Sequence, residues 1–357
     1  MRAALHALIL VPALLLSGCS TVEAFDALVP KDSGATAVAK DQRFPPGPGG
    51  RLDVYAPKDA SASERLPVIV FFYGGSWNSG AKEGYAFAGR ALASRGFVTF
   101  VPDYRLTSRA SYPAFLEDCA AAVRWVRANA ARFGGDPDRI VLAGHSAGAY
   151  NAAMLSVDPR WLGADRAAVR GFAGLAGPYS FLPLDTEVTK ETFGHVADLA
   201  STQPVNFASG DDPPALLIAG GRDDLVFGSN SIEMAMKLSE AGVPVETRVY
   251  PELGHVGVMT ALSTLFRGRA PVLDDIAAFA HRVTQGTGRR PMGVVAPEGD
   301  DSVDEKKENN PEERAFSGHP DHPPANPDQT VEANQELLCQ PDGDEEAEPG
   351  SAVDKAG

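Results

Sequence analysis

The most constraining feature of the sequence is a glycine-flanked serine between a strand pattern and a helix pattern. Residues 144–148 read Gly-His-Ser-Ala-Gly; the apolar run 140–143 precedes them, and residues 149–156 have helical character. A chain that turns sharply from strand to helix at a serine needs glycines two positions before and after it, because a Cβ there meets the tight backbone. The hydroxyl then stands above the sheet. We therefore predict that Ser146 is a nucleophile.

A serine nucleophile needs a base. The hydroxyl is a poor nucleophile near neutral pH, so a histidine must remove its proton as it attacks. His255 lies in a loop beyond the strand pattern of residues 243–250. Since the active site of an open α/β sheet gathers at the carboxyl ends of its strands, this loop is expected beside Ser146. His255 is the predicted base.

The base in turn needs an acid. A carboxylate on the other ring nitrogen fixes the tautomer of the histidine and stabilises the imidazolium that forms. Asp223 and Asp224 both follow the apolar strand pattern of residues 214–220, and they compete for this role. The one that is not the acid is available to cap the next helix.

The fourth part of such a site is an oxyanion hole. Tyr-Gly-Gly-Ser-Trp at residues 73–77 follows the apolar run 68–72, and glycines there let backbone N–H groups approach a developing oxyanion. Each such donor is worth about 2.7 to 4 kcal/mol of transition-state stabilisation. We expect amides of Gly74, Gly75 or Ser76 to form the hole with the amide of Ala147. The alternative interpretation is an ordinary Gly-Gly turn.

Four sequence blocks, taken together and in this order, resemble one enzyme family. They are residues 71–77, residues 102–106, residues 112–118 with 123–126, and residues 143–149. The resemblance covers roughly residues 50–285. The family is the α/β-hydrolase-fold serine esterases, in the branch near hormone-sensitive-lipase-like enzymes, kynurenine formamidases and bifunctional feruloyl and acetyl-xylan esterases. The resemblance implies hydrolysis of an ester or an amide.

The resemblance also bears on single residues. Gly220-x-x-Asp223-x-x-Val226 is similar to the family's acid loop, which favours Asp223 over Asp224. The Asp-Tyr-Arg-Leu block at residues 103–106 matches one whose arginine braces loops in the family, so we assign Tyr104, Arg105 and Asp118 to structure. Tyr73 departs from the family, whose oxyanion block usually begins with histidine. His145 is similar to the Gly-His-Ser branch and favours the formamidase and carbohydrate-esterase side.

The alternation of strand and helix patterns predicts one α/β domain at residues 51–285, with a mostly parallel sheet and helices on both faces. The resemblance implies that this is an α/β-hydrolase fold with a small cap at about residues 178–213. Cap residues that could line a pocket or pack in the core are Phe181, Leu182, Leu184, Phe193 and Phe207. Strand patterns cover residues 52–55, 68–72, 97–101, 140–143, 171–175, 215–219 and 245–250. Helix patterns cover residues 86–94, 114–131, 149–156, 231–241 and 273–284.

The amino terminus resembles a bacterial lipoprotein signal. A short positive start is followed by an apolar run, residues 5–16, which is too short to span a membrane, and then by Leu-Ser-Gly-Cys ending at Cys19. We predict a signal peptide at residues 1–18, a lipid-modified Cys19 that anchors the chain in a membrane, and a tether at residues 19–50. Ser20 favours the outer membrane or periplasmic face of a bacterial cell envelope. A plain secretory peptide is the alternative.

Charge is concentrated at the carboxyl end. Residues 286–357 hold 6 basic and 18 acidic side chains, which accounts for −12 of the net charge of −15. Such a segment cannot bury enough apolar surface to offset its ordering entropy, so we expect an acidic disordered tail. The acidity also argues against nucleic-acid binding, which needs basic side chains for the phosphates.

The cysteines and histidines indicate no metal and no cofactor. The chain has three cysteines and seven histidines, and none of their spacings resembles a zinc site. Cys119 lies in a helix pattern and is expected to be a small buried side chain. Cys339 lies in the acidic tail and has no obvious partner.

The sequence therefore predicts a serine carboxylic-ester hydrolase with the triad Ser146, Asp223 and His255. It would act through an acyl-enzyme on small or carbohydrate-linked esters. Two alternatives stay open: an aryl formamidase-type amide hydrolase, and a catalytically dead hydrolase-fold scaffold used for binding. The sequence makes no prediction of oligomeric state.

Overall fold

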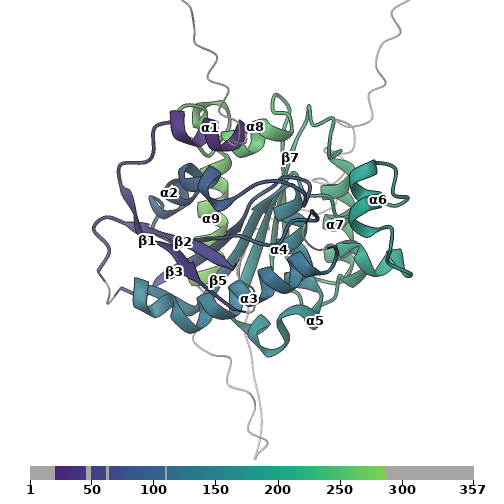
Figure 1. The fold of residues 1–357 in the computed structure, drawn as a ribbon, viewed down its shortest axis with the longest axis horizontal. Coiled ribbons are helices and arrows are strands. Elements are labelled where there is room, and N and C mark those ends of the chain that lie inside the picture. Colours follow the sequence, from purple (N-terminus) through teal and green to yellow (C-terminus); the bar gives the residue numbers. More distant parts are fainter. Residues whose placement is uncertain (1–20, 46–49, 62–63, 109–110, 286–357) are drawn as a thin grey trace, which may run out of the picture. The chain divides into compact units, whose positions relative to one another are not determined.

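The structure is a computed structural model that describes residues 21–45, 50–61, 64–108 and 111–285. Its sheet has eight strands in the order β1-β2-β4-β3-β5-β6-β7-β8 (Figure 1). β2 is antiparallel to both of its neighbours, and every other neighbouring pair is parallel. The strands are β1 (Ala35–Arg43), β2 (Arg51–Pro57), β3 (Leu66–Phe72), β4 (Val98–Pro102), β5 (Gly135–His145), β6 (Val169–Leu175), β7 (Ala215–Gly220) and β8 (Val245–Tyr250).

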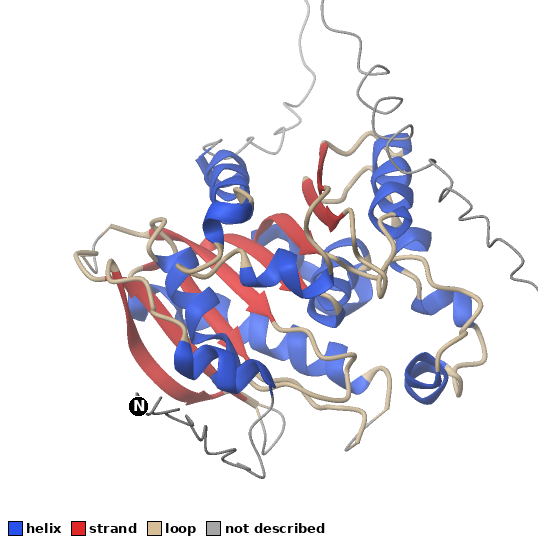
Figure 2. Cartoon of the chain, turned by 90° about the horizontal axis from the view of Figure 1, so that it is seen from above, coloured by secondary structure: helices blue, strands red, loops and turns tan. Residues whose placement is uncertain are grey.

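Helices cover both faces of this sheet (Figures 1 and 2). α2 (Ala86–Ala93) packs with α9 (Val272–Gln285) on one face, while α3 (Ala114–Asn129), α4 (Ala147–Val157) and α7 (Ser229–Glu240) cover the other. The central strands are buried on both sides and are therefore apolar almost throughout, as parallel strands under two helical layers must be. The prediction of a mostly parallel sheet with helices on both faces is confirmed.

The prediction of a tether at residues 19–50 is wrong for residues 21–45. α1 (Thr21–Leu28) packs onto the domain through Phe25, whose ring meets Phe87 edge-on at 5.2 Å. The Asp26 carboxylate accepts a hydrogen bond from the Phe87 amide at 2.7 Å, at the start of α2. β1 then adds an edge strand to the sheet. Its exposed lysine, arginine and aspartate hide the strand pattern and protect this edge strand from further pairing.

The predicted cap holds α6 (Glu187–Phe193) and two short 3₁₀ turns, η4 (Leu199–Thr202) and η5 (Pro204–Phe207). Phe193 is fully buried, and its ring meets that of Trp77 edge-on at 5.0 Å, so it serves packing. The Tyr150 hydroxyl, on α4, donates to the carbonyl oxygen of Thr202 at 2.7 Å. These contacts fix the segment to the helix that follows the candidate nucleophile.

Two short helices complete the described chain, α5 (Pro159–Leu162) and α8 (His255–Thr260). Cys119 is fully buried, as predicted, and burial raises the pKa of its thiol. In the described ranges, no helix is long and apolar enough to cross a bilayer. The predicted signal peptide, Cys19, the acidic tail and Cys339 lie outside the described residues.

Candidate active site

The predicted site residues gather at one edge of the sheet. β3, β5, β7 and β8 run parallel, so their carboxyl ends lie on the same side. The loops after these four strands carry, in order, the Gly-Gly turn, Ser146, Asp223 and His255. This is the edge at which open α/β sheets bind their ligands.

Ser146 stands at a strained turn between β5 and α4. Its backbone has φ 54° and ψ −122°, outside the regions that a residue with a side chain ordinarily occupies. Its amide donates to the carbonyl oxygen of Leu175 at 2.8 Å, which ties the turn to β6. Strain of this kind costs about 1 to 3 kcal/mol and persists where the surroundings enforce it, most often at functional sites.

The two glycines of the motif are required by space. A Cβ on Gly144 would lie 2.3 Å from the carbonyl oxygen of Gly148, and a Cβ on Gly148 would lie 2.1 Å from that of Phe72. Both obstacles are backbone atoms, which cannot rotate away as a side chain can. The prediction that the turn needs these glycines is confirmed.

Asp223 and His255 form the acid and base pair. His255 Nδ1 lies 2.8 Å from Asp223 Oδ2, and the Asp223 side chain is completely buried. Burial alone would raise the pKa of Asp223, but the hydrogen bonds from His255 and from the amides of Val226 and Leu225 hold it below its usual value. Asp223 is therefore a carboxylate that holds Nδ1–H and leaves Nε2 available.

Asp224 is excluded from both roles that the sequence left to it. It is exposed, while Asp223 takes the histidine. The next helix, α7, begins after Gly228 and has no side-chain cap. The cap interpretation of Asp224 is thus wrong, because four residues separate it from the helix start.

His145, which directly precedes Ser146, links the loop of His255 to the strand that carries the nucleophile. His145 Nε2 lies 3.0 Å from the carbonyl oxygen of His255, and the two rings are 4.8 Å apart. Within the described part of the chain, no hydrogen bond joins the Ser146 hydroxyl to His255. Catalytic hydrogen bonds in unliganded structures are often long and tighten when substrate binds. The sequence reasoning treated His145 only as a family marker and missed this contact.

The Gly-Gly turn lies against the nucleophile. A Cβ on Gly74 would be 3.1 Å from the Cβ of Ser146, so the turn and the elbow are in direct contact. Gly75 has φ 131° and Ser76 has φ 51°, and their amides donate to no backbone oxygen among the described residues. The amide of Ala147 opens α4, where helical N–H groups have no partner within the helix. These amides are the candidate oxyanion donors.

Tyr73, at the start of this turn, is held by Asp103 and Tyr104. Its hydroxyl donates to Asp103 Oδ1 at 3.2 Å, and its ring stacks on Tyr104 at 4.5 Å. The Tyr104 hydroxyl donates to the carbonyl oxygen of Tyr73 at 2.7 Å. Asp103 also accepts from the amide of Lys82 at 2.9 Å, and burial raises the pKa of its carboxyl to about 6. The tyrosine that departs from the family pattern is therefore held by the Asp-Tyr block next to β4.

The rest of the Asp-Tyr-Arg block is structural, as predicted. Arg105 Nε donates to Asp118 Oδ2 at 2.8 Å, and Asp118 also accepts from the Arg105 amide at 2.8 Å. This pair fastens the loop after β4 to α3. In the described part of the chain, no group of three or more His, Cys, Asp and Glu side chains is placed to hold a metal ion.

Exposed apolar side chains flank the acid and base pair. Leu225 and Phe227 follow Asp223 and are 63% and 65% exposed, and Val256 follows His255 and is 59% exposed. Asn230, in the first turn of α7, joins this helix to the cap, because its Oδ1 accepts from the amides of Tyr179 and Ser180, each at 2.9 Å. Large apolar groups so exposed beside a reactive pair are available to contact a ligand.

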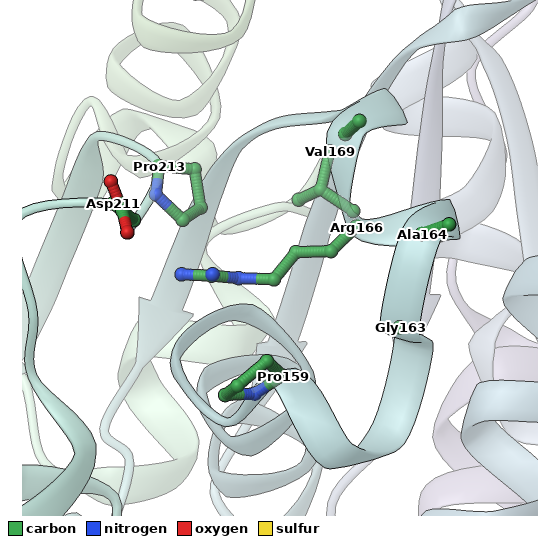
Figure 3. Close-up of a pocket in the computed structure, with 8 residues that line it drawn as sticks. Pro159, Gly163, Ala164, Arg166, Val169, Asp211 and Pro213 are labelled. Atoms are coloured by element: carbon green, nitrogen blue, oxygen red, sulfur yellow. The ribbon is translucent and has the colours of Figure 1, made fainter.

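A separate pocket of about 400 Å³ lies at the amino ends of β6 and β7 (Figure 3). Pro159, Gly163 and Val169 line one side, and Asp211 and Pro213 line the other. Arg166 extends across it and is paired with Asp212. None of the predicted catalytic residues lines this pocket.

Comparisons with known proteins find one family model and several named esterases that are similar to this chain. The BD-FAE family model matches residues 52–166, less than half of the chain. Esterase LipQ of Mycobacterium tuberculosis is 27% identical over 287 residues, which are 72% of this chain and 67% of LipQ. Esterase LipC of the same organism is 31% identical over 202 residues, half of this chain and 49% of LipC. The chain thus spans between half and two thirds of these relatives.

Solved structures show the same fold. A truncated carbohydrate esterase from gut microbiota aligns with a TM-score of 0.63 and 22% identity, covering 72% of this chain and all of that one. Esterase 2 of Thermogutta terrifontis aligns with a TM-score of 0.58 and 23% identity, covering 73% and 98%. The fold is an α/β-hydrolase fold. The similarities to named esterases support a carboxylesterase-type hydrolase.

Proposed function

We propose that the chain is a serine carboxylic-ester hydrolase that works through an acyl-enzyme. One observation carries this proposal. Asp223 and His255 form a hydrogen bond of 2.8 Å, and His255 also contacts His145, which directly precedes the strained Ser146. A buried carboxylate, a histidine and a serine at the carboxyl ends of neighbouring strands are the parts that acyl transfer needs.

The chemistry follows from these positions. Ser146 Oγ attacks the ester carbonyl while His255 Nε2 takes its proton, and Asp223 stabilises the imidazolium through Nδ1–H. Backbone amides of Gly75, Ser76 and Ala147 stabilise the oxyanion. His255 returns the proton to the leaving alcohol, which leaves an acyl group on the serine. Water then attacks the acyl group with the same histidine as base, releasing the acid and restoring Ser146.

We propose small or carbohydrate-linked esters as the substrates. One of the structural relatives is a carbohydrate esterase, which supports this class. The exposed Leu225, Phe227 and Val256 beside the catalytic pair suit a substrate with an apolar acyl or aryl group, because such a group would bury them on binding.

The test is hydrolysis of p-nitrophenyl esters from acetate to decanoate by the wild type and by Ser146→Ala. We expect turnover of the short esters and its loss, by at least 10⁴-fold, in the variant. Ser156→Ala is the matched control, since Ser156 lies on the same helix and its hydroxyl donates to the carbonyl oxygen of Ala152, within that helix. The control is expected to keep its activity.

The same assay separates the alternatives. A folded wild type that hydrolyses an aryl formamide but no ester would replace the ester assignment with the formamidase one. A folded wild type that hydrolyses neither, and whose Ser146 fails to react with a fluorophosphonate, would leave the binding scaffold as the explanation.

We also propose export and lipid anchoring through Cys19, at the outer membrane or periplasmic face of a bacterial envelope. The support is the sequence pattern that ends at Cys19. Because α1 begins at Thr21, an anchor at Cys19 would hold the domain close to the membrane surface. Radiolabelled palmitate incorporation into the wild type, and its loss in Cys19→Ala, is the measurement; equal labelling of both would contradict the proposal.

A further inference from the structure

His145 lies between two parts of the site. It ends β5, directly before Ser146, and only 4% of its surface is exposed. On one side its Nε2 lies 3.0 Å from the carbonyl oxygen of His255. On the other side it meets the oxyanion turn, because a Cβ on Gly74 would lie 2.8 Å from its Nδ1. The ring thus fills the space between the base and the oxyanion turn.

The contact with His255 fixes the tautomer of His145. A carbonyl oxygen can only accept, so Nε2 must carry the proton and Nδ1 must be unprotonated. Nδ1 is buried and has no hydrogen-bond partner among the described residues. A buried acceptor without a partner is costly, so packing alone does not account for a histidine here.

His145 also stays uncharged. Burial, and then the neighbouring His255, lower the pKa of His145 to about 3. The groups that face it are His255 and Asp223, from the loops after β8 and β7, and the backbone of Gly74. Because the ring stays neutral well above this pKa, the hydrogen bond does not change with pH in the neutral range.

We propose that His145 is a positioning residue that holds the backbone of the base against the strand that carries the nucleophile. Asp223 fixes one ring nitrogen of His255, and His145 fixes its carbonyl oxygen. Two attachment points orient the imidazole toward Ser146, which is the chain neighbour of His145. The inference deepens the proposed function and rests on it.

The first test compares two variants of full-length protein with p-nitrophenyl acetate. His145→Leu keeps much of the volume and removes the donor, and we expect kcat to fall about tenfold, the factor that corresponds to 1.4 kcal/mol, with little change in KM. His145→Gln keeps an N–H donor near the position of Nε2, and we expect it to recover to within about threefold of the wild type. A purely packing role would show no such recovery.

His281→Leu is the matched control. His281 Nε2 makes the same kind of contact, 2.8 Å from the carbonyl oxygen of Arg95, away from the catalytic loops. Its loss is expected to lower the melting temperature and leave kcat within about twofold. Full activity in His145→Leu, or equal losses in His145→Leu and His145→Gln, would overturn the proposal. If His145→Leu does not fold, His145→Asn, whose amide is too short to reach, takes its place with the same expectations.

A second measurement does not depend on turnover, so it separates this inference from the proposed function. Imidazole ¹⁵N NMR of the wild type should show His145 as the neutral Nε2–H tautomer from pH 4.5 to 8. In His145→Leu the proton between His255 and Asp223 should exchange faster with water than in the wild type. A His145 that titrates near pH 6.5, or an unchanged exchange rate, would contradict the positioning role even if the chain hydrolyses no ester.

Discussion

The carboxyl edge of the sheet, where the parallel strands end, holds more strained backbone than its amino edge, where they begin. Of the six described non-glycine residues with positive φ, four follow parallel strands at the carboxyl edge: Ser76, Trp77, Ser146 and Ala176. Arg65, before β3, is the one at the amino edge. Strained backbone therefore concentrates where the nucleophile and the candidate oxyanion donors lie, because these groups must leave the sheet at sharp angles.

The carboxylates of the two edges differ as well. At the carboxyl edge, Asp223 holds a histidine whose other nitrogen is available for chemistry. At the amino edge, Asp212 is paired with Arg166 and accepts from the amide and the hydroxyl of Ser209 at 2.8 and 3.0 Å. The first arrangement leaves His255 Nε2 available to react, whereas in the second the aspartate is held by an arginine and a serine and presents no reactive group. Substitutions at the first edge should change rates, and substitutions at the second should change stability.

Asp223→Asn should have the largest effect on the rate. The amide cannot hold the histidine in the required tautomer or stabilise the imidazolium, so kcat should fall about 10⁴-fold with the fold retained. Asp224→Asn is the matched control, since the neighbouring carboxylate is exposed, and it should change kcat less than twofold. Steady-state kinetics with p-nitrophenyl acetate decide. Equal losses in the two variants would remove the distinction between the adjacent aspartates.

Arg166→Met should have the largest effect on stability. It leaves the completely buried Asp212 side chain without its cation, which should lower the free energy of unfolding by about 3 kcal/mol. The rate constants should stay within about twofold, because the pair is at the edge opposite the catalytic loops. Asp211→Asn, at an exposed neighbour, should change neither quantity. Urea unfolding with parallel kinetics tests the separation, and a fall in kcat at full stability would break it.

The sequence predicted the elements whose local residue pattern already reflects their place in the fold. Seven strand patterns and five helix patterns correspond to observed elements, because central parallel strands are apolar on both faces. The triad candidates were found because the elbow glycines are needed for steric reasons at fixed spacing and the acid and base follow strand ends. Ser146 and His255 therefore came from the sequence pattern, while the choice of Asp223 over Asp224 came from the resemblance to the family.

What the sequence missed depends on contacts between distant segments. β1 is a charged edge strand, and α1 is held by Phe25 and Asp26 against residues some 60 positions away. Neither has a local pattern that distinguishes it from a polar linker. The contact of His145 with the carbonyl oxygen of His255 spans 110 positions, and a histidine inside the elbow motif gives no sign of it.

Tyr73→Phe should have smaller effects on rate and stability than the two variants above, and its effect on the rate should still mark the carboxyl edge. Removing the hydroxyl takes one donor from Asp103, which should cost about 1 kcal/mol of stability and slow kcat a few-fold as the oxyanion turn loosens. Tyr55→Phe is the control, because its hydroxyl also donates to an aspartate, Asp53 Oδ2 at 3.4 Å, on a strand remote from the site. Both variants should lose stability, measured by urea unfolding. Only Tyr73→Phe should lose rate.

Asp103→Asn should change the stability by an amount that depends on pH. Burial raises the pKa of the folded carboxyl to about 6, above the usual value of 3.8, so folding favours its protonated form. That contribution is fully present below pH 3.8 and is lost as the pH rises through 6. Asparagine does not ionise and still accepts from Lys82. The stability of the variant relative to the wild type should therefore improve between pH 4 and pH 7, by about 1 to 2 kcal/mol, in urea unfolding at each pH. A difference that stays constant with pH would show that the pKa of Asp103 is the same in the folded and unfolded states, and that folding does not bury this carboxyl beneath the oxyanion turn.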